Sequence, residues 1–191
     1  MNGKLIVITG LDGSGTTSLA EALSARDPGS VVFKTPSSPY DAMRKAIDEQ
    51  VREESQAAHY LFYLSSVVYA STQIETLLKT GNVYCVRYLI DTVVSHRAAG
   101  LNVELVYAND LYKIKAPDLT ILLQLDESIR QSRITVRGKG VLDKLLDDET
   151  LRSRFNKEFQ RYQDQYEIVK NNSENIGQAV EDTLQFMKWD Y

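Results

Sequence analysis

The chain has 191 residues, of which 43% are hydrophobic and 25% charged, and its formal net charge at pH 7 is −4. These values are typical of one globular domain, 1–191, and no stretch reaches the roughly 18 uncharged apolar residues that a membrane span needs. The negative net charge argues against an extended nucleic-acid surface, since such surfaces bind phosphate through many lysine and arginine contacts.

The first predicted element is a buried strand over 4–9, which leads through a glycine-rich loop into a helix over 17–25. No small-residue cleavage site of a secretory signal precedes this strand, so we expect a cytoplasmic location. A second strand is predicted at 31–33. The segments after it are a Pro36–Pro39 turn, a charged helix over 40–54 and a long helix over 56–78 that is apolar on more than one side.

A third strand is predicted at 83–86, where Cys85 has no second cysteine to pair with and is expected to pack as a small hydrophobe. The nearly continuous apolar run 119–125 is typical of an interior parallel strand. The other predicted elements are helices at 92–96, 108–114, 127–136 and 147–169, a strand near 174–176, and a closing helix ending at 189. Alternating strands and helices predict an α/β fold, with a parallel sheet covered by helices on both faces.

The loop after the first strand carries a phosphate-binding pattern. Residues Gly10 to Thr17 match G-x-x-x-x-G-K-[ST] at every fixed position except the lysine, where Thr16 stands. Glycines let backbone N–H groups turn toward phosphate oxygens, and the following helix adds its positive N-terminal end. The Thr17 hydroxyl would hold Mg²⁺. We therefore predict binding of ATP and Mg²⁺ by Gly10, Asp12, Gly13, Ser14, Gly15, Thr16, Thr17 and Ser18.

The missing lysine normally supplies a mobile positive charge near the outer phosphates. Five other cations could serve in its place: Arg87, Arg130, Arg133, Arg137 and Lys139. Arg133 and Arg137 lie four residues apart, on one helix face that runs into Gly138 and Gly140. This arrangement is typical of a lid that closes on phosphates, predicted over about 133–146, although a solvated helix face would show the same pattern.

With these residues in place, the chain resembles the thymidylate kinase family of nucleoside monophosphate kinases. The resemblance covers the whole length, and its motifs occur in the family's order: the glycine loop, Phe62-Tyr63, Arg87-Tyr88, the lid over 133–144, and finally Phe155 and Tyr162. It implies a P-loop NTPase fold with a parallel five-stranded sheet and a short lid. It also implies transfer of the γ-phosphate of ATP to thymidylate (dTMP) with Mg²⁺.

The resemblance assigns roles to individual residues. Asp12 would lie near the acceptor sugar, Arg87 would grip the acceptor phosphate, and Arg133 and Arg137 would embrace the transferred group, which makes these four the predicted catalytic residues. The predicted acceptor-binding residues are Lys34, Phe62, Ser66, Arg87, Tyr88 and Asp91. Family members form dimers through helices that flank the sheet. The apolar stretch 60–70 could form such a homodimer interface, or could equally belong to the core.

Several positions depart from the family pattern. Val86 stands in place of the aspartate before Arg87 and cannot bind Mg²⁺, and Ser66 replaces the arginine that reads the thymine edge. The other departures are Lys34-Thr35-Pro36 for Arg-Glu-Pro, and Asp91 and His96 for a serine and a glutamine. Because a base-reading site leaves costly unmatched polar groups with the wrong base, these changes predict an altered or relaxed base preference.

Two of the substituted positions allow more than one interpretation. Asp91 could accept hydrogen bonds from an amino-bearing base or a sugar hydroxyl, but it also precedes a predicted helix and could simply cap it. His96 is expected to be a polar helix residue rather than a general base, because phosphoryl transfer depends mainly on positioning and electrostatics.

Three functions remain open on the sequence. The leading hypothesis is a nucleotide kinase of the thymidylate kinase type, with dTMP as the first choice of acceptor. The second is a kinase acting on another nucleotide, a nucleoside or another small molecule, although a nucleoside has no phosphate for Arg87 to hold. The third is a degenerate relative that binds nucleotide without turnover, because both the loop lysine and the aspartate before Arg87 are absent.

Overall fold

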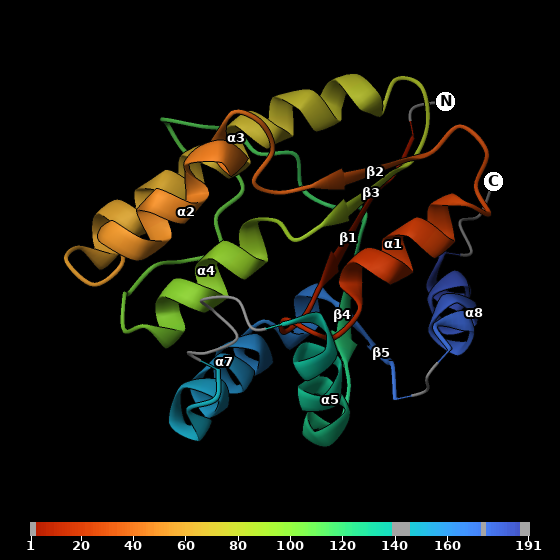
Figure 1. Ribbon diagram of the computed structural model, residues 1–191. Coiled ribbons are helices and arrows are strands. Elements are labelled where there is room, and N and C mark those ends of the chain that lie inside the picture. Colours follow the sequence, from red (N-terminus) through yellow and green to blue (C-terminus); the bar gives the residue numbers. More distant parts are fainter. Residues whose placement is uncertain (1–2, 139–145, 173–174, 188–191) are drawn as a thin grey trace.

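The computed structural model describes residues 3–138, 146–172 and 175–187. Its centre is a parallel sheet of five strands in the order β2-β3-β1-β4-β5 (Figure 1). The strands are β1 (Leu5–Thr9), β2 (Val31–Lys34), β3 (Val83–Val86), β4 (Leu119–Gln124) and β5 (Glu167–Lys170). The helices are α1 (Thr16–Ser24), α2 (Tyr40–Gln50), α3 (Gln56–Leu77), α4 (Leu89–Ala98), α5 (Glu127–Arg137), α7 (Glu149–Arg161) and α8 (Gly177–Phe186), with a 3₁₀ turn η1 (Gln163–Gln165).

Both faces of the sheet are buried, as the apolar strands predict. In β1, Leu5 and Val7 join an apolar cluster with residues of α3 and α4, while Ile6 and Ile8 join a second cluster with residues of α1 and α8. This split follows from the strand geometry, because successive side chains point to opposite faces. The predicted α/β fold, with a five-stranded parallel sheet and helices on both sides, is therefore confirmed. Cys85 is fully buried in the α3 cluster, as expected of a small hydrophobe.

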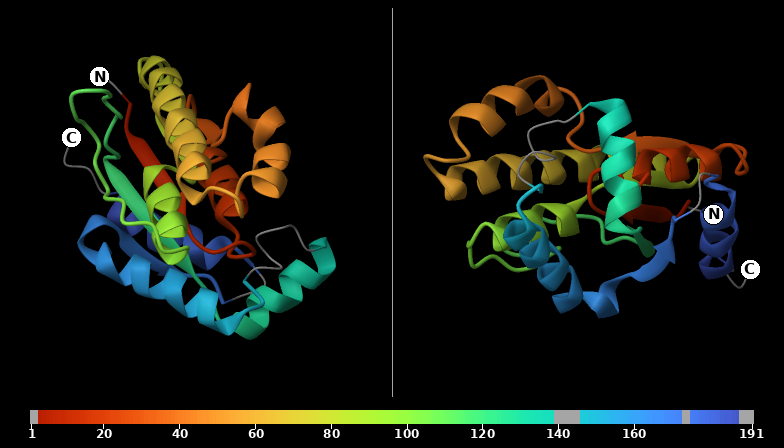
Figure 2. Two further views of the ribbon diagram at one scale, coloured as in Figure 1. Left: turned by 90° about the vertical axis from the view of Figure 1, so that its left-hand side faces the viewer. Right: turned by 60° about the horizontal axis from the view of Figure 1, so that its bottom comes forward.

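The helix α3 supports a further layer outside the sheet. It begins at a Ser55 cap, whose side chain accepts a hydrogen bond from the Ala58 N–H. One side of α3 packs into the core, whereas α2 has no buried residue and lies along α3 away from the sheet (Figure 2). The charged α2 therefore has one helix as its main support, and its polar side chains remain free to form a site.

Three predicted elements are wrong in the second half of the chain. The segment 108–114 is not helical and instead contains an isolated bridge between Ala108 and Lys113. The helix predicted over 147–169 ends at Arg161, and the last strand is Glu167–Lys170 rather than 174–176. Only Val169 of this edge strand is buried, so its sequence lacks the apolar run that identifies an interior strand. Pairing with β4 makes it a strand.

The sheet register brings three chain segments together at one edge. Ile8 of β1 pairs with Val86 of β3 and with Ile121 of β4, and in each case the chain then leaves the sheet on the same side. The glycine loop follows β1 and Arg87 follows β3. Ligands of open α/β sheets bind outside these carboxyl ends, where the strand order reverses. Within the described ranges, no helix is both long enough and apolar enough to cross a membrane.

Candidate active site

The glycine loop is shaped by backbone conformations that favour glycine. Gly13 and Gly15 have φ values of 88° and 95°, in the left-handed region. A Cβ atom on Gly13 would lie 2.9 Å from Ile134 Cγ1, and one on Gly15 would lie 2.8 Å from Asn171 Nδ2. The loop is therefore packed directly against α5 and against the segment after β5. Helix α1 begins immediately behind it, at Thr16.

Donors outside the loop hold its carbonyl groups. Arg130 Nη1 donates to the Asp12 carbonyl at 3.1 Å, and Asn171 Nδ2 donates to the Ser14 carbonyl at 2.8 Å. In a trans peptide the C=O and the next N–H point in opposite directions, so the N–H groups of Gly13 and Gly15 face away from these donors. Both glycines line a cavity. The amides of Gly13 and Gly15 are thus turned toward the side of the loop away from Arg130 and Asn171, and phosphate binding by this loop stays a prediction.

The sequence suggests Arg130 either as a cation that replaces the lysine or as part of a solvated helix face, and the structure shows neither position. Its side chain is only 1% exposed, and two of its guanidinium nitrogens donate to the carboxylate of Glu127 at 2.7 and 2.8 Å. It therefore supports the loop from behind. Arg133 is placed similarly: it donates to the carbonyls of Ser14 at 3.4 Å and Asn171 at 3.2 Å, but it also lines the phosphate cavity.

The cavity in front of the loop collects most of the predicted nucleotide-binding residues. It is lined by Asp12, Gly13, Gly15, Thr16, Thr17, Ser18, Lys34, Thr35, Pro36, Asp41, Arg44, Val86, Arg87 and Arg133. Ser14 does not line it, because its side chain is buried and its N–H donates to the Leu11 carbonyl. Gly10 lines the neighbouring cavity instead. Arg137 is the last residue of α5, and the predicted lid at 139–145 lies outside the described residues.

Arg87 occupies the junction of the loop, β3 and α4. Among the described residues it alone has a positive φ without being glycine, at 65°, a conformation that side chains rarely adopt. Its guanidinium forms ion pairs with Asp12 and, at 3.0 Å, with Asp91. Its backbone is held at both ends, since its N–H donates to Ile8 and its carbonyl accepts from the Thr35 hydroxyl. Burial opposes the charge of Arg87, but the two carboxylates outweigh burial and raise its pKa.

Asp91 is a capping residue, although not at the predicted position. Helix α4 begins at Leu89, so Asp91 is its third residue, and it accepts the Tyr88 N–H at 2.9 Å. It also accepts the Thr9 hydroxyl at 2.6 Å and an Arg87 N–H. Burial raises the pKa of Asp91, and these donors only partly oppose that effect. Its acceptor capacity is thus largely used within the protein.

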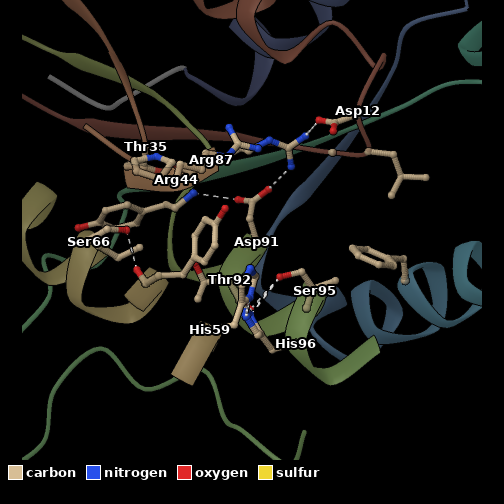
Figure 3. A pocket seen from close by; sticks show the side chains of 18 of the residues that line it. Asp12, Thr35, Arg44, His59, Ser66, Arg87, Asp91, Thr92, Ser95 and His96 are labelled. Atoms are coloured by element: carbon tan, nitrogen blue, oxygen red, sulfur yellow. Dashed lines mark hydrogen bonds and ion pairs between the residues drawn. The ribbon is translucent and has the colours of Figure 1, made fainter. Parts of the chain in front are cut away.

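A second cavity adjoins the first and shares Asp12, Thr35, Pro36, Arg44 and Arg87 with it (Figure 3). Its other lining residues are Gly10, Leu11, Arg52, His59, Tyr63, Ser66, Val67, Tyr88, Asp91, Thr92, Val94, Ser95, His96, Leu146, Phe155 and Phe159. The two cavities meet at the residues that they share, among them Arg87. It contains both polar and aromatic side chains.

The predicted acceptor-binding residues divide between the two cavities. Ser66, Arg87, Tyr88 and Asp91 line the second cavity, and Lys34 lines the first. Phe62 lines neither, and its ring packs against Tyr40 and Tyr63 at centroid distances of 5.5 and 5.4 Å. The hydroxyl of Ser66 donates to the carbonyl of Tyr63 at 2.7 Å, so it does not replace the donor capacity of the family's arginine.

Sequence reasoning missed a polar cluster in this second cavity. Asp48 contacts His59, and His59 contacts His96, which lies on α4 as a polar helix residue and is only 2% exposed. Arg44 and Arg52 flank the same aspartate, and Arg44 lines both cavities. The spacing of Arg44, Asp48 and Arg52, each four residues apart, was the available signal, because it places them on one helix face.

Comparison with known proteins agrees with this geometry. The family model for thymidylate kinase matches residues 8–183. The chain belongs to the thymidylate kinase family. A protein named "probable thymidylate kinase" from Methanococcus maripaludis is 25% identical over 187 residues, covering 95% of this chain and 93% of the relative. A protein of the same name from Pyrobaculum aerophilum is 32% identical over 139 residues, covering 70% of each chain.

Solved structures share the fold of this thymidylate kinase family member. Thymidylate kinase from Candida albicans superposes with a TM-score of 0.75 at 21% identity, covering 98% of this chain and 92% of that one. Deoxyadenosine kinase from M. mycoides superposes with a TM-score of 0.70 at 18% identity, covering 97% and 100% of the two chains. At these identities the likeness establishes the architecture. The family match is what establishes a phosphotransferase.

Substitution of Gly13 tests the glycine loop. We expect Gly13→Ala to weaken ATP binding by about tenfold or more, or about 1.4 kcal/mol, because the new Cβ would collide with Ile134 and displace the loop amides. Gly100→Ala is the matched control: Gly100 also has a positive φ, at 102°, but nothing lies within 4 Å of its Cβ position. Calorimetric titration with ATP measures both. Equal losses of affinity would show that the loop packing is irrelevant to binding.

Proposed function

We propose that the protein transfers the γ-phosphate of ATP to thymidylate, giving ADP and dTDP. The observation that carries this proposal is the pair of adjoining cavities, one formed by the glycine loop, with Asp12, Arg44 and Arg87 at their shared boundary. Phosphoryl transfer requires the donor and acceptor to be held in line with charge stabilisation between them. Membership of the thymidylate kinase family supports the choice of donor and acceptor.

The chain fits a triphosphate donor with Mg²⁺. The amides of Gly13 and Gly15 and the N-terminus of α1 face the phosphate cavity, and the Thr17 hydroxyl lines it. In the described part of the chain, no group of three or more histidine, cysteine or acidic side chains is placed to hold a metal. This agrees with Mg²⁺, which usually keeps waters and substrate phosphates as ligands and takes few from the protein. Bound Mg²⁺ would neutralise charge on the outer phosphates, next to Thr17.

Other cations stand in for the missing loop lysine. Four line the phosphate cavity, but Arg87 is already paired with two aspartates, and Arg133 binds loop carbonyls. Lys34 forms a 3.6 Å ion pair with Glu21, and both side chains are more than half exposed, so this pair constrains Lys34 little. Arg44 is itself paired with Asp48 at 3.4 Å, so we assign Lys34 to the charge that Thr16 cannot supply.

Arg87 also favours a nucleotide over a nucleoside as acceptor. The positive φ of Arg87 and its two carboxylate partners fix the guanidinium at the mouth of the second cavity. A fixed guanidinium at that place would orient the phosphate of a nucleoside monophosphate. A nucleoside would leave it without an anionic ligand, so the structure gives no support to the nucleoside-kinase alternative.

Turnover with a panel of acceptors tests the proposal. We expect ADP formation from ATP and Mg²⁺ to be accelerated by dTMP far more than by thymidine, as measured in a coupled assay. Omission of Mg²⁺ should abolish the reaction, because the outer phosphates would then lack their counter-ion. If no acceptor accelerates ADP formation while ATP still raises the unfolding temperature, the protein binds nucleotide without turnover, and the kinase proposal fails.

Exchange of Arg87 for lysine tests the shared boundary. An ammonium group cannot span Asp12 and Asp91 as the planar guanidinium does, so we expect kcat/KM for dTMP to fall at least about tenfold. Because the charge is retained, Asp91 keeps a cationic neighbour, and the urea midpoint should change little. Arg26→Lys is the control, since Arg26 pairs with Glu181 outside both cavities. An unchanged kcat/KM in Arg87→Lys would show that the Arg87 guanidinium does not orient the acceptor phosphate.

We further propose a homodimer that uses α3. Leu61 and Tyr69 lie on this helix with exposed fractions of 60% and 41%, although other residues of the same stretch are buried. Light scattering after size exclusion should give twice the chain mass of 21.6 kDa, and Leu61→Arg should halve it. Leu111→Arg is the control and should leave the mass unchanged, because Leu111 is equally apolar and 89% exposed but lies in another segment. A wild-type protein that elutes as a monomer at high concentration would exclude this interface.

A further inference from the structure

Asp48 of α2 is the centre of a polar cluster beside the acceptor cavity. Its Oδ1 atom lies 2.9 Å from His59 Nε2, accepts the Tyr63 hydroxyl at 2.8 Å, and pairs with Arg52 Nη2 at 3.2 Å. Arg44 Nε approaches Oδ2 at 3.4 Å. Burial opposes ionisation of Asp48, but these donors outweigh burial and hold its pKa well below its usual range. The carboxylate is therefore charged, and four side chains are arranged around it.

The hydrogen bonds of the two histidines require one extra proton. His96 Nδ1 lies 2.7 Å from the Thr92 carbonyl, which can only accept, so this nitrogen carries a proton. His59 Nε2 faces the Asp48 carboxylate, which also accepts, so this nitrogen carries a proton too. The remaining nitrogens, His59 Nδ1 and His96 Nε2, are 2.7 Å apart and would both be lone pairs if the rings were neutral. The 2.7 Å contact therefore places a proton between the two rings.

Burial disfavours a charge on His96. Burial lowers the pKa of His96 to about 4, and the positive charges of His59 and Arg52 lower it further, whereas the Thr92 carbonyl opposes this effect. His59, by contrast, lies directly against the Asp48 carboxylate. Asp48, His59 and His96 thus form a chain from α2 through α3 to α4 (Figure 3 shows the two histidines). This chain fixes Asp48, and Asp48 in turn fixes Arg52.

Arg52 has a donor without a partner. Its Nε atom is buried and has no hydrogen-bond acceptor among the described residues, although Nη2 is held by Asp48. Arg52 lines the acceptor cavity, as does Ser66, whose hydroxyl is already used by the Tyr63 carbonyl. The two carboxylates that line this cavity, Asp12 and Asp91, are paired with Arg87. A buried N–H without an acceptor is costly, so a ligand that brings an acceptor to it gains affinity.

We propose that Arg52 selects the base of the acceptor nucleotide by donating its Nε–H to a carbonyl oxygen of that base. This inference rests on the proposed function, because it needs a nucleotide in the second cavity. A base with an oxo group at this point, such as thymine, pairs with the N–H. A base with an amino group there, such as cytosine, sets one donor against another and leaves both unmatched. The guanidinium lost at Ser66 is thereby replaced by one from the segment after α2.

Arg52 is a specificity residue in this scheme, and Asp48, His59 and His96 are positioning residues. The alternative is that Arg52 only holds α2 in place through its ion pair with Asp48. The two roles differ in their effect on competing acceptors. A structural role would weaken all acceptors alike, whereas base selection weakens dTMP and spares dCMP, which carries an amino group in place of one carbonyl oxygen.

The test compares dTMP and dCMP on wild-type protein and on Arg52→Gln. We expect the wild type to prefer dTMP by at least about tenfold in kcat/KM, and Arg52→Gln to lose most of that preference through a higher KM for dTMP. Both acceptors are measured on one preparation, so the ratio does not depend on the folded fraction. Arg154→Gln is the matched control, since Arg154 is exposed on α7 and lines neither cavity.

His59→Gln provides a second readout. Loss of the imidazole should release Asp48 and Arg52, so the KM for dTMP should rise while the KM for ATP stays unchanged. Calorimetric titration of dTMP and dCMP without ATP measures the same preference in the absence of turnover. If the wild type binds dTMP no better than dCMP, or if Arg52→Gln weakens both equally, the inference is overturned. If dTMP is preferred in binding but no acceptor is phosphorylated, the inference stands, and it is the kinase proposal that fails.

Discussion

The site depends on one interaction, the placement of the Arg87 guanidinium between the carboxylates of Asp12 and Asp91. Asp12 belongs to the loop after β1, Arg87 follows β3, and Asp91 lies in the first turn of α4, so this group joins three elements at the edge where the strand order reverses. The left-handed backbone of Arg87 shows that the chain tolerates strain to place it there. Arg87 lines both cavities.

The glycine loop is held in place by side chains that lie outside it. Arg130 and Asn171 bind its carbonyl groups, and the trans geometry of the peptides then turns the Gly13 and Gly15 amides toward the cavity. A loop held in this way does not need a lysine to keep its shape, which explains how Thr16 is accommodated. What the lysine would add is charge, and four other cations line the cavity: Lys34, Arg44, Arg87 and Arg133.

In the second cavity, too, side chains of another element stand near the position of a missing one. Ser66 on α3 stands where the family has an arginine, so one guanidinium is missing there. Two other guanidinium groups line the same cavity, from Arg44 on α2 and Arg52 in the segment after it. Such long cations need a fixed counter-ion to be specific, and Asp48 is that counter-ion, held by His59, which in turn contacts His96 of α4. Departures from the family pattern that look like losses in the sequence thus have counterparts elsewhere in the fold.

By itself, the sequence determined the α/β class, the parallel sheet and the place of the glycine loop between β1 and α1, because apolar runs and the spacing of glycines are local signals. It also singled out Arg87, whose role toward an acceptor stays a prediction. It did not identify β5, because an edge strand with one buried residue has no strand pattern of its own and exists through pairing with β4. Only the tertiary structure decided that Arg130 is buried behind the loop and that His59 meets His96. Those contacts join residues 118 and 37 positions apart, and no local pattern in a single sequence records such distances.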